Sequence, residues 1–184
     1  MFKVFSLLAF FVLLTSGGCI WGGQSRETRF FDLKAEQSKS LLLPCEVNFM
    51  LFRNLSGADR RFLVRQSGNR LRGDEFNRWL LDPELLLERF LREDLRGKSG
   101  PTVRVRGVLT AFEFDLLRKE AVLGIDFTLT SGENSRHFNC RIREKISSGG
   151  EDFSSSAAAA MNICATRAAG ELRRSITALL QASK

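Results

Sequence analysis

The sequence is poor in the residues that most often build catalytic and metal sites. Its 184 residues include one histidine, His137, which excludes a histidine-rich zinc site and leaves a catalytic dyad a single candidate. The four cysteines form no Cys-x-x-Cys pair, so zinc binding and thioredoxin-type redox chemistry are unsupported. His137 and Cys140 lie three apart on an expected strand and would point to opposite faces. We expect a non-catalytic protein without metal or cofactor, in which His137 faces solvent.

The chain also lacks a long apolar run, and its N-terminus has the organisation of a signal peptide. Lys3 gives a positive start, residues 5–14 are apolar and residues 15–18 are small. The run is shorter than the roughly 18 to 20 residues that a membrane-spanning helix needs, and the glycines that follow would break a longer helix. The pattern predicts an exported protein with a signal peptide over 1–18.

Cys19 stands directly after these small residues. In a bacterial lipoprotein such a cysteine is acylated, and the signal peptide is then removed directly before it. The usual motif has leucine where this chain has Ser16, and cleavage after Gly18 by an ordinary signal peptidase would instead give a soluble periplasmic protein. We expect Cys19 to carry the lipid anchor and 19–27 to form the tether. Because Ile20 replaces the aspartate that retains lipoproteins at the inner membrane, the pattern favours the periplasmic face of the outer membrane.

Residues 28–184 show the alternation and helical spacing of one α+β domain. Apolar and polar residues alternate in several segments, as in half-buried strands; these segments are 45–54, 61–66, 102–115, 121–130 and 135–144. Gly107 marks a bulge or a close approach within one of them. Residues 28–33 are expected to be extended.

Helical spacing appears in two places, over 74–95 and from about residue 155. Asp74 is expected to cap a short first turn that carries Phe76 and Trp79, and Asp82 to cap a second helix that begins at Pro83. The predicted fold is therefore a single domain with one antiparallel sheet and helices packed on one face.

Cys45, Cys140 and Cys164 all fall on expected apolar faces. They can be buried thiols that pack as small hydrophobic side chains. One disulfide, for example between Cys45 and Cys140, is the alternative, because an exported chain meets oxidising conditions. The sequence leaves both open.

A basic stripe is the most distinctive polar feature. Arg104 and Arg106 alternate outward on one expected strand, and Arg141 and Arg143 do so on another. If the two strands share a sheet, four guanidinium groups occupy one face. That face is either simply solvated or a docking surface for an acidic partner or lipid headgroups. The net charge of +7 is dispersed without a Lys/Arg block, and together with export this argues against a nucleic-acid partner.

Several motifs follow one another in a recognisable order. After the cysteine come "TRFFDL", "RRFLVRQ", "DEFNRWLLDP", "VRGVLTAFEFD" and "AAAAMNICA". In this order they resemble the PqiC-like family of ABC-type transport auxiliary lipoproteins. Phe30, Phe31 and Leu33 fill the places of that family's Tyr-Tyr-x-Leu segment, in a chain that has no tyrosine.

The resemblance implies a lipoprotein without catalytic activity that works beside an MCE-domain periplasmic protein and an ABC permease in lipid transport. It would dock the periplasmic conduit at the outer membrane. Phe30 and Phe31 would either pack as an edge strand on their own sheet or contact a neighbour, and they join the four arginines as candidate docking residues. Another outer-membrane assembly lipoprotein or envelope scaffold is the alternative function, and a homo-oligomer stays open.

Overall fold

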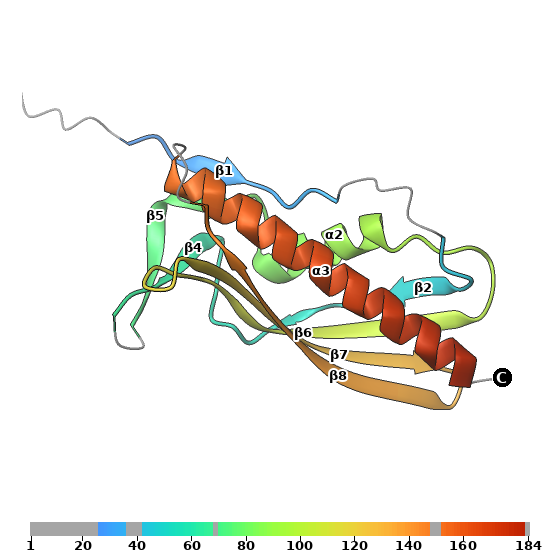
Figure 1. The fold of residues 1–184 in the computed structure, drawn as a ribbon. Helices are drawn as coiled ribbons and strands as arrows, with labels where there is room; N and C mark the ends of the chain where they lie inside the picture. Colours follow the sequence, from blue (N-terminus) through green and yellow to red (C-terminus); the bar gives the residue numbers. More distant parts are fainter. Residues whose placement is uncertain (1–25, 36–41, 68–69, 148–151, 183–184) are drawn as a thin grey trace, which may run out of the picture.

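The computed structural model describes residues 26–35, 42–67, 70–147 and 152–182. They form an eight-stranded sheet and two helices, α2 (Pro83–Asp94) and α3 (Phe153–Ala182), and α3 runs across the long strands (Figure 1). The expected signal peptide and Cys19 lie outside the described residues. Neither helix is long and apolar enough to cross a membrane within those ranges.

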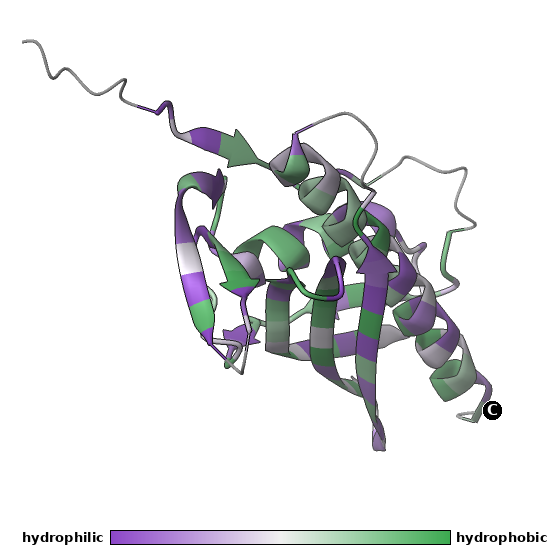
Figure 2. Cartoon of the chain, turned by 60° about the vertical axis from the view of Figure 1, so that its left-hand side comes forward, coloured by the Kyte–Doolittle hydropathy of each residue, from purple (hydrophilic) through white to green (hydrophobic). Residues whose placement is uncertain are grey.

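Three long antiparallel strands form one side of the sheet, with β8 at its edge: β6 (Thr102–Asp115), β7 (Glu120–Ser131) and β8 (Asn134–Lys145). Apolar and polar residues alternate along much of their length (Figure 2), so one face is buried and the other is largely exposed. Near the β6–β7 turn both faces are buried, at 111–114 of β6 and 121–125 of β7. Val105, Leu123 and Ile125 are fully buried on the face that α3 covers. The strands predicted from the alternation are therefore confirmed here.

Shorter strands complete the sheet on the other side of β6. In chain order they are β1 (Arg29–Phe31), β2 (Glu46–Phe49), β3 (Arg53–Asn54), β4 (Arg61–Arg65) and β5 (Leu71–Trp79). β2, β3 and β4 pair with β6 in parallel, β5 is antiparallel to β4, and β1 is parallel to β5.

The α+β prediction, with helices on one face, is confirmed, but the sheet is mixed rather than wholly antiparallel. Parallel strands need a crossover connection, and the segment through β5 and α2 provides one between β4 and β6. Alternation along a strand does not encode the direction of its neighbour. Parallel pairing was therefore not predictable from that pattern.

The predicted helical turn at 74–79 is wrong, because this segment belongs to strand β5. Asn77 and Trp79 point inward, whereas Phe76 and Arg78 are exposed. Asp74 does accept hydrogen bonds from the backbone N–H groups of Phe76 (2.8 Å) and Asn77 (3.2 Å). This local contact resembles a helix cap in sequence, but strand pairing to β4 and β1 decides the conformation.

The second predicted helix is confirmed as α2, which has Asp82 at the N-cap position and Pro83 at its start, but the Asp82 side chain makes no capping hydrogen bond. The core between helices and sheet is rich in aromatic rings. Trp79 is fully buried, with its ring centroid 4.6 Å from that of Phe62 and 5.1 Å from that of Phe112. A Cβ on Gly107 would lie 2.5 Å from the Phe52 ring, which confirms a close approach there; the bulge of β6 instead falls between Leu109 and Ala111.

All three described cysteines are buried and free, so the hypothesis of a Cys45–Cys140 disulfide is wrong and the buried-thiol alternative holds. Burial, which disfavours the thiolate, raises the pKa of Cys140 to about 11 and that of Cys164 to about 12. The Sγ of Cys164 donates to the carbonyl oxygen of Ala121 at 3.7 Å. These thiols pack α3 against the sheet.

Candidate functional site: the polar face of the sheet

The register of the long strands decides which side chains share the uncovered face. Arg106 lies opposite Thr128, which lies opposite His137, and Arg104 lies opposite Thr130. Residues directly opposite each other point to the same side of a sheet. We call this side the polar face; it is the side away from α3.

All four predicted arginines lie on the polar face, but in two separate pairs. Arg141 is opposite Gly124, four positions along β7 from Thr128, which corresponds to about 13 Å along the strand. We call Arg104 and Arg106 the distal pair, because they lie far from the β6–β7 turn. Arg141 and Arg143 are the proximal pair.

The distal pair is exposed and makes no salt bridge in the part of the chain that the structure describes. Both side chains line a pocket of about 180 Å³, together with Met50, Thr128 and Thr130. Met50 supplies an exposed apolar wall, and its backbone N–H donates to the Val105 carbonyl oxygen at 2.8 Å. Unpaired guanidinium groups beside an apolar wall are suited to binding carboxylates or phosphates in two-point hydrogen bonds.

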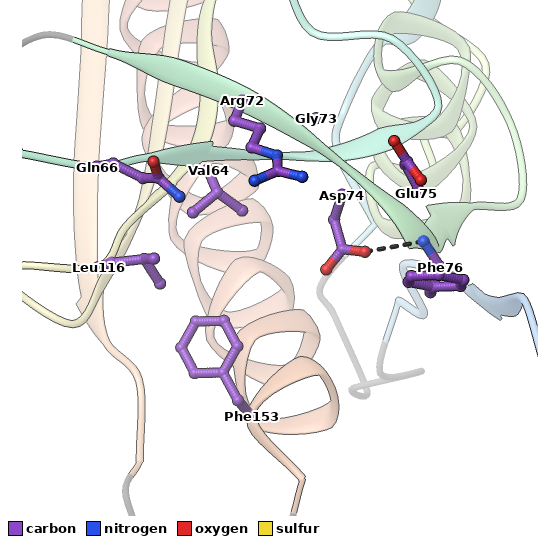
Figure 3. Close-up of a pocket in the computed structure, with 9 residues that line it drawn as sticks. All are labelled: Val64, Gln66, Arg72, Gly73, Asp74, Glu75, Phe76, Leu116 and Phe153. Atoms are coloured by element: carbon purple, nitrogen blue, oxygen red, sulfur yellow. Dashed lines mark hydrogen bonds between the residues drawn. The ribbon is translucent and has the colours of Figure 1, made fainter. Parts of the chain in front are cut away.

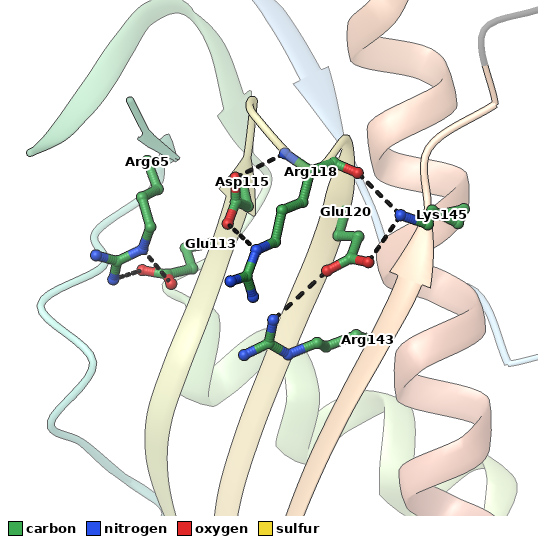
Figure 4. Close-up of polar contacts among 7 residues, drawn as sticks. All are labelled: Arg65, Glu113, Asp115, Arg118, Glu120, Arg143 and Lys145. Atoms are coloured by element: carbon green, nitrogen blue, oxygen red, sulfur yellow. Dashed lines mark hydrogen bonds and ion pairs between the residues drawn. The ribbon is translucent and has the colours of Figure 1, made fainter. Parts of the chain in front are cut away.

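The proximal pair belongs to a pocket of about 420 Å³ that is rich in ion pairs (Figure 4). Glu113, only 5% exposed, accepts two hydrogen bonds from Arg65, at 2.9 and 2.8 Å. The hydrogen bonds to this carboxylate hold the pKa of Arg65 above its usual value. Such a two-point pair fixes both side chains, so neither is free to bind a ligand.

Glu120 organises the other side of this pocket. Its carboxylate lies 2.9 Å from Lys145 Nζ and 3.6 Å from an Arg143 nitrogen. The hydrogen bond from Lys145, followed by the charges of Lys145 and Arg143, holds the pKa of Glu120 below its usual value. Arg143 is therefore partly neutralised. Arg141 has no salt bridge to any described residue, so the proximal pair contributes one unpaired guanidinium group.

His137 is an exposed residue of the polar face, as expected. Its Nδ1 lies 2.9 Å from the Thr128 hydroxyl, and Cys140 is buried on the opposite face, so the two side chains do not meet. Among the described residues, no group of three His, Cys, Asp or Glu side chains is placed to hold a metal ion.

The two phenylalanines of β1, which the sequence suggested as docking residues, have different environments. Phe31 packs on Phe62, with ring centroids 4.9 Å apart, whereas Phe30 is 56% exposed. β1 is indeed an edge strand. Phe31 is therefore partly buried against the core, and Phe30 is the more available of the two to a neighbour.

Arg29 ties this edge to the start of α3, a contact that the sequence did not suggest. Its guanidinium group forms a salt bridge with Asp152 and donates to Asn77 Oδ1 (2.9 Å) and Ser154 Oγ (3.2 Å). The hydrogen bond from Arg29 lowers the pKa of Asp152. Residues 123 positions apart are joined in this way, and no local pattern reports such a contact.

A second region missed from the sequence surrounds an apolar pocket of about 330 Å³ beside the β6–β7 turn (Figure 3). Phe76, Leu116 and Phe153 line it and are each more than a third exposed. The signal available in the sequence was the pair of leucines in "DLLRKE", which begins a turn rather than continuing a strand.

Comparison with known proteins identifies a fold. No protein-family model and no curated protein matches the chain. An uncharacterised protein of known structure superposes with a TM-score of 0.67 at 10% identity, over 82% of this chain and 99% of that chain. A Xanthomonas campestris protein of the domain family DUF330 superposes with a TM-score of 0.57 at 14% identity, over 78% of this chain and 92% of that chain.

At these identities the likeness concerns the fold alone. The chain is thus an α+β protein with the architecture of a DUF330 structure, and this architecture is consistent with a fold of the PqiC/DUF330 type.

Proposed function

We propose that this protein is a non-catalytic, periplasm-facing lipoprotein that docks the periplasmic conduit of an ABC/MCE-type lipid transport system at the outer membrane. The observation that carries the proposal is the fold shared with a DUF330 protein over most of both chains. The signal-like segment that ends at Cys19 supports an acylated anchor. In this proposal an MCE-domain protein and its ABC permease are the partners, and nucleic acid is not.

The polar face supports a docking role. Arg104, Arg106 and Arg141 are exposed and make no salt bridge to any described residue. Positive charges without a counter-ion attract an acidic partner surface, and the arginines can form charge-assisted hydrogen bonds with that surface once it has docked. Phe30, exposed on the edge strand, can add an apolar contact at the other side of the molecule.

The carboxylates on the same face support a role in binding rather than in acid–base chemistry. Glu113 is held by Arg65 and Glu120 by Lys145 and Arg143. The hydrogen bond from Lys145 and the charges of Lys145 and Arg143 hold the pKa of Glu120 below its usual value, whereas a general acid must hold its proton near neutral pH. We therefore propose a docking protein and not an enzyme.

The test is a detergent pull-down of full-length protein from native membranes, with the co-purifying chains identified by mass spectrometry. Recovery of an MCE-domain protein and its permease is the expected result. The Cys19→Ala variant is the control for the anchor, and we expect it to be lost from the membrane fraction. If only other envelope proteins co-purify, the alternative of an outer-membrane scaffold replaces the transport role.

A further inference from the structure

The turn between β6 and β7 carries an unusual sequence for an exposed tip. Leu116 and Leu117 are followed by Arg118 and Lys119, and the two leucines are 38% and 71% exposed. Neither leucine contributes to the buried core. Leucines at the end of a hairpin, followed at once by cations, are the arrangement expected where apolar side chains enter a membrane interface and cations stay with the headgroups.

The exposed apolar surface continues beyond the turn. Leu116 lines the same pocket as Phe76 of β5 and Phe153, the first residue of α3 (Figure 3). Leu117, the next residue of the turn, lines the adjoining polar pocket beside Arg118. We call the four exposed side chains at this end, Phe76, Leu116, Leu117 and Phe153, the apolar tip. Three separate elements thus expose large apolar side chains around one pocket, Phe76, Leu116 and Phe153, and a contiguous apolar patch commonly marks an interaction site.

The tether leaves the domain beside the apolar tip. The guanidinium carbon of Arg26 lies 5.7 Å from the centroid of the Phe76 ring. Only seven residues of chain lead from Cys19 to Arg26, and a fully extended chain of that length spans at most about 25 Å. A lipid on Cys19 would therefore keep the Arg26 backbone within about 25 Å of the bilayer surface, with the Phe76 ring in contact with the Arg26 side chain.

The charges around the tip suit an anionic surface. Arg26, Arg72 and Lys119 make no salt bridge to any described residue. Of the nearby acids, Asp115 is paired with Arg118, Asp152 with Arg29, and Asp74 accepts the backbone N–H groups of β5. Glu75 is the acid lining the pocket without such a partner in the described ranges. Among these groups, the unpaired cations Arg26, Arg72 and Lys119 exceed the carboxylates Asp74 and Glu75 by one charge, and each cation near an anionic leaflet adds about 1 kcal/mol of attraction.

We propose that the apolar tip inserts into the anionic lipid surface to which Cys19 anchors the chain. The proposal rests on the proposed function for the anchor alone. It also fixes an orientation: Arg104 lies eleven residues along β6 from Asp115, about 36 Å at the rise of a strand. Insertion of the tip would therefore hold the distal arginine pair away from the membrane, where a periplasmic partner can reach it.

The experiment uses an environment-sensitive fluorophore on the full processed lipoprotein. The three described native thiols are buried, and burial raises their pKa, so an introduced cysteine should be labelled selectively in the folded protein. Leu117→Cys places the nitrobenzoxadiazole label at the tip, and Ser135→Cys, also exposed, places it at the other end of the sheet. Each labelled protein is reconstituted into phosphatidylethanolamine–phosphatidylglycerol vesicles with brominated or ordinary acyl chains.

We expect bromine to reduce the fluorescence of the tip label by about two-fold or more and to leave the Ser135→Cys label unchanged, because insertion places the tip at the acyl boundary. Flotation of the vesicles reports the anchor separately. Retained flotation with an unquenched tip label would overturn tip insertion alone. Loss of flotation would overturn the anchor and the insertion together. If the tip label is not quenched by bromine, and its fluorescence changes only when envelope proteins are added, the tip contacts a protein partner and the proposal is wrong.

Discussion

The two faces of the β6–β7–β8 sheet come from the same strands but meet different surroundings. On one face, α3 covers Leu123, Ile125 and their neighbours with small side chains such as Ala165 and Ala168, all fully buried. On the other face, arginines and threonines stay accessible. The helix face therefore sets stability, whereas the distal part of the polar face, around Arg104 and Arg106, is exposed and can serve recognition.

The largest expected effect is the loss of stability when a side chain on the helix face is truncated. Ile125→Ala should lower the free energy of unfolding by about 2 to 5 kcal/mol, because it removes buried methyl groups and leaves a cavity. Thr130→Ala, on the polar face of the same strand, should change it by less than about 0.5 kcal/mol. Urea titration followed by circular dichroism measures both. Equal losses would contradict the division between the faces.

The second prediction compares the distal and proximal arginine pairs of the polar face. Arg104→Glu with Arg106→Glu should weaken partner binding by about 100-fold or more, because four units of charge are changed at an acidic contact. Arg141→Glu with Arg143→Glu should have a smaller effect, since Arg143 is already paired with Glu120. Binding of purified proteins at rising salt measures this, and wild-type affinity should fall as salt rises.

Arg136→Glu is the matched control for these reversals. Arg136 is exposed and lies opposite Leu129, so it shares the side of the sheet that α3 packs on. The same change of charge there should leave binding within about two-fold of wild type at physiological salt. If Arg136→Glu weakened partner binding as much as reversal of the distal pair, net charge rather than the position of the arginines would govern binding.

The third prediction concerns alkaline pH. Because burial raises the pKa of Cys140 to about 11 and of Cys164 to about 12, their contribution to stability is complete below the ordinary thiol pKa of about 8.5. It is lost as pH rises towards the folded values, since the unfolded chain releases the protons first. Stability measured from pH 8 to 10 should fall by about 1 to 2 kcal/mol per thiol.

The Cys140→Ala, Cys164→Ala double variant should show a flatter dependence over the same range. The chain has no tyrosine, so phenol ionisation does not obscure the measurement. A wild-type curve as flat as that of the variant would show that these thiols are not buried as described.

The smallest effect concerns the edge strand. Arg29 lowers the pKa of Asp152, so their pair stabilises the fold above the ordinary carboxyl pKa of about 3.9 and ceases to do so as pH falls through the lower folded value. The side chains are 45% and 42% exposed, and solvent screening limits the effect to about 0.5 kcal/mol. Comparison of wild type with Asp152→Asn between pH 6 and 3 measures it, and parallel curves would contradict the assignment.

The sequence predicted the long strands because their period-two alternation reflects burial on one face. For the same reason it placed Arg104, Arg106 and Arg141 on a common face. It could not show that Arg143 is paired with Glu120, because that contact depends on the register between β7 and β8. Register is set by turns and tertiary packing rather than by the charges themselves.

Other features depended on contacts between distant segments. Phe76 and Trp79 have a spacing compatible with a helix, but pairing with β4 and β1 makes their segment a strand. The apolar tip joins residues from β5, the β6–β7 turn and α3, which no local pattern brings together. Phe30 and Phe31 were equivalent in sequence, and only the packing of Phe31 on Phe62 separates them.

The central claim is that the polar face docks a lipid-transport partner, and one measurement tests it most directly. Wild type, Arg136→Glu and the fourfold reversal of Arg104, Arg106, Arg141 and Arg143 to glutamate are pulled down in parallel from native membranes. The account predicts an MCE-domain protein with its permease in the first two and a loss of about tenfold or more in the third. Equal recovery of that partner by all three proteins, or its absence from wild type, would contradict the account.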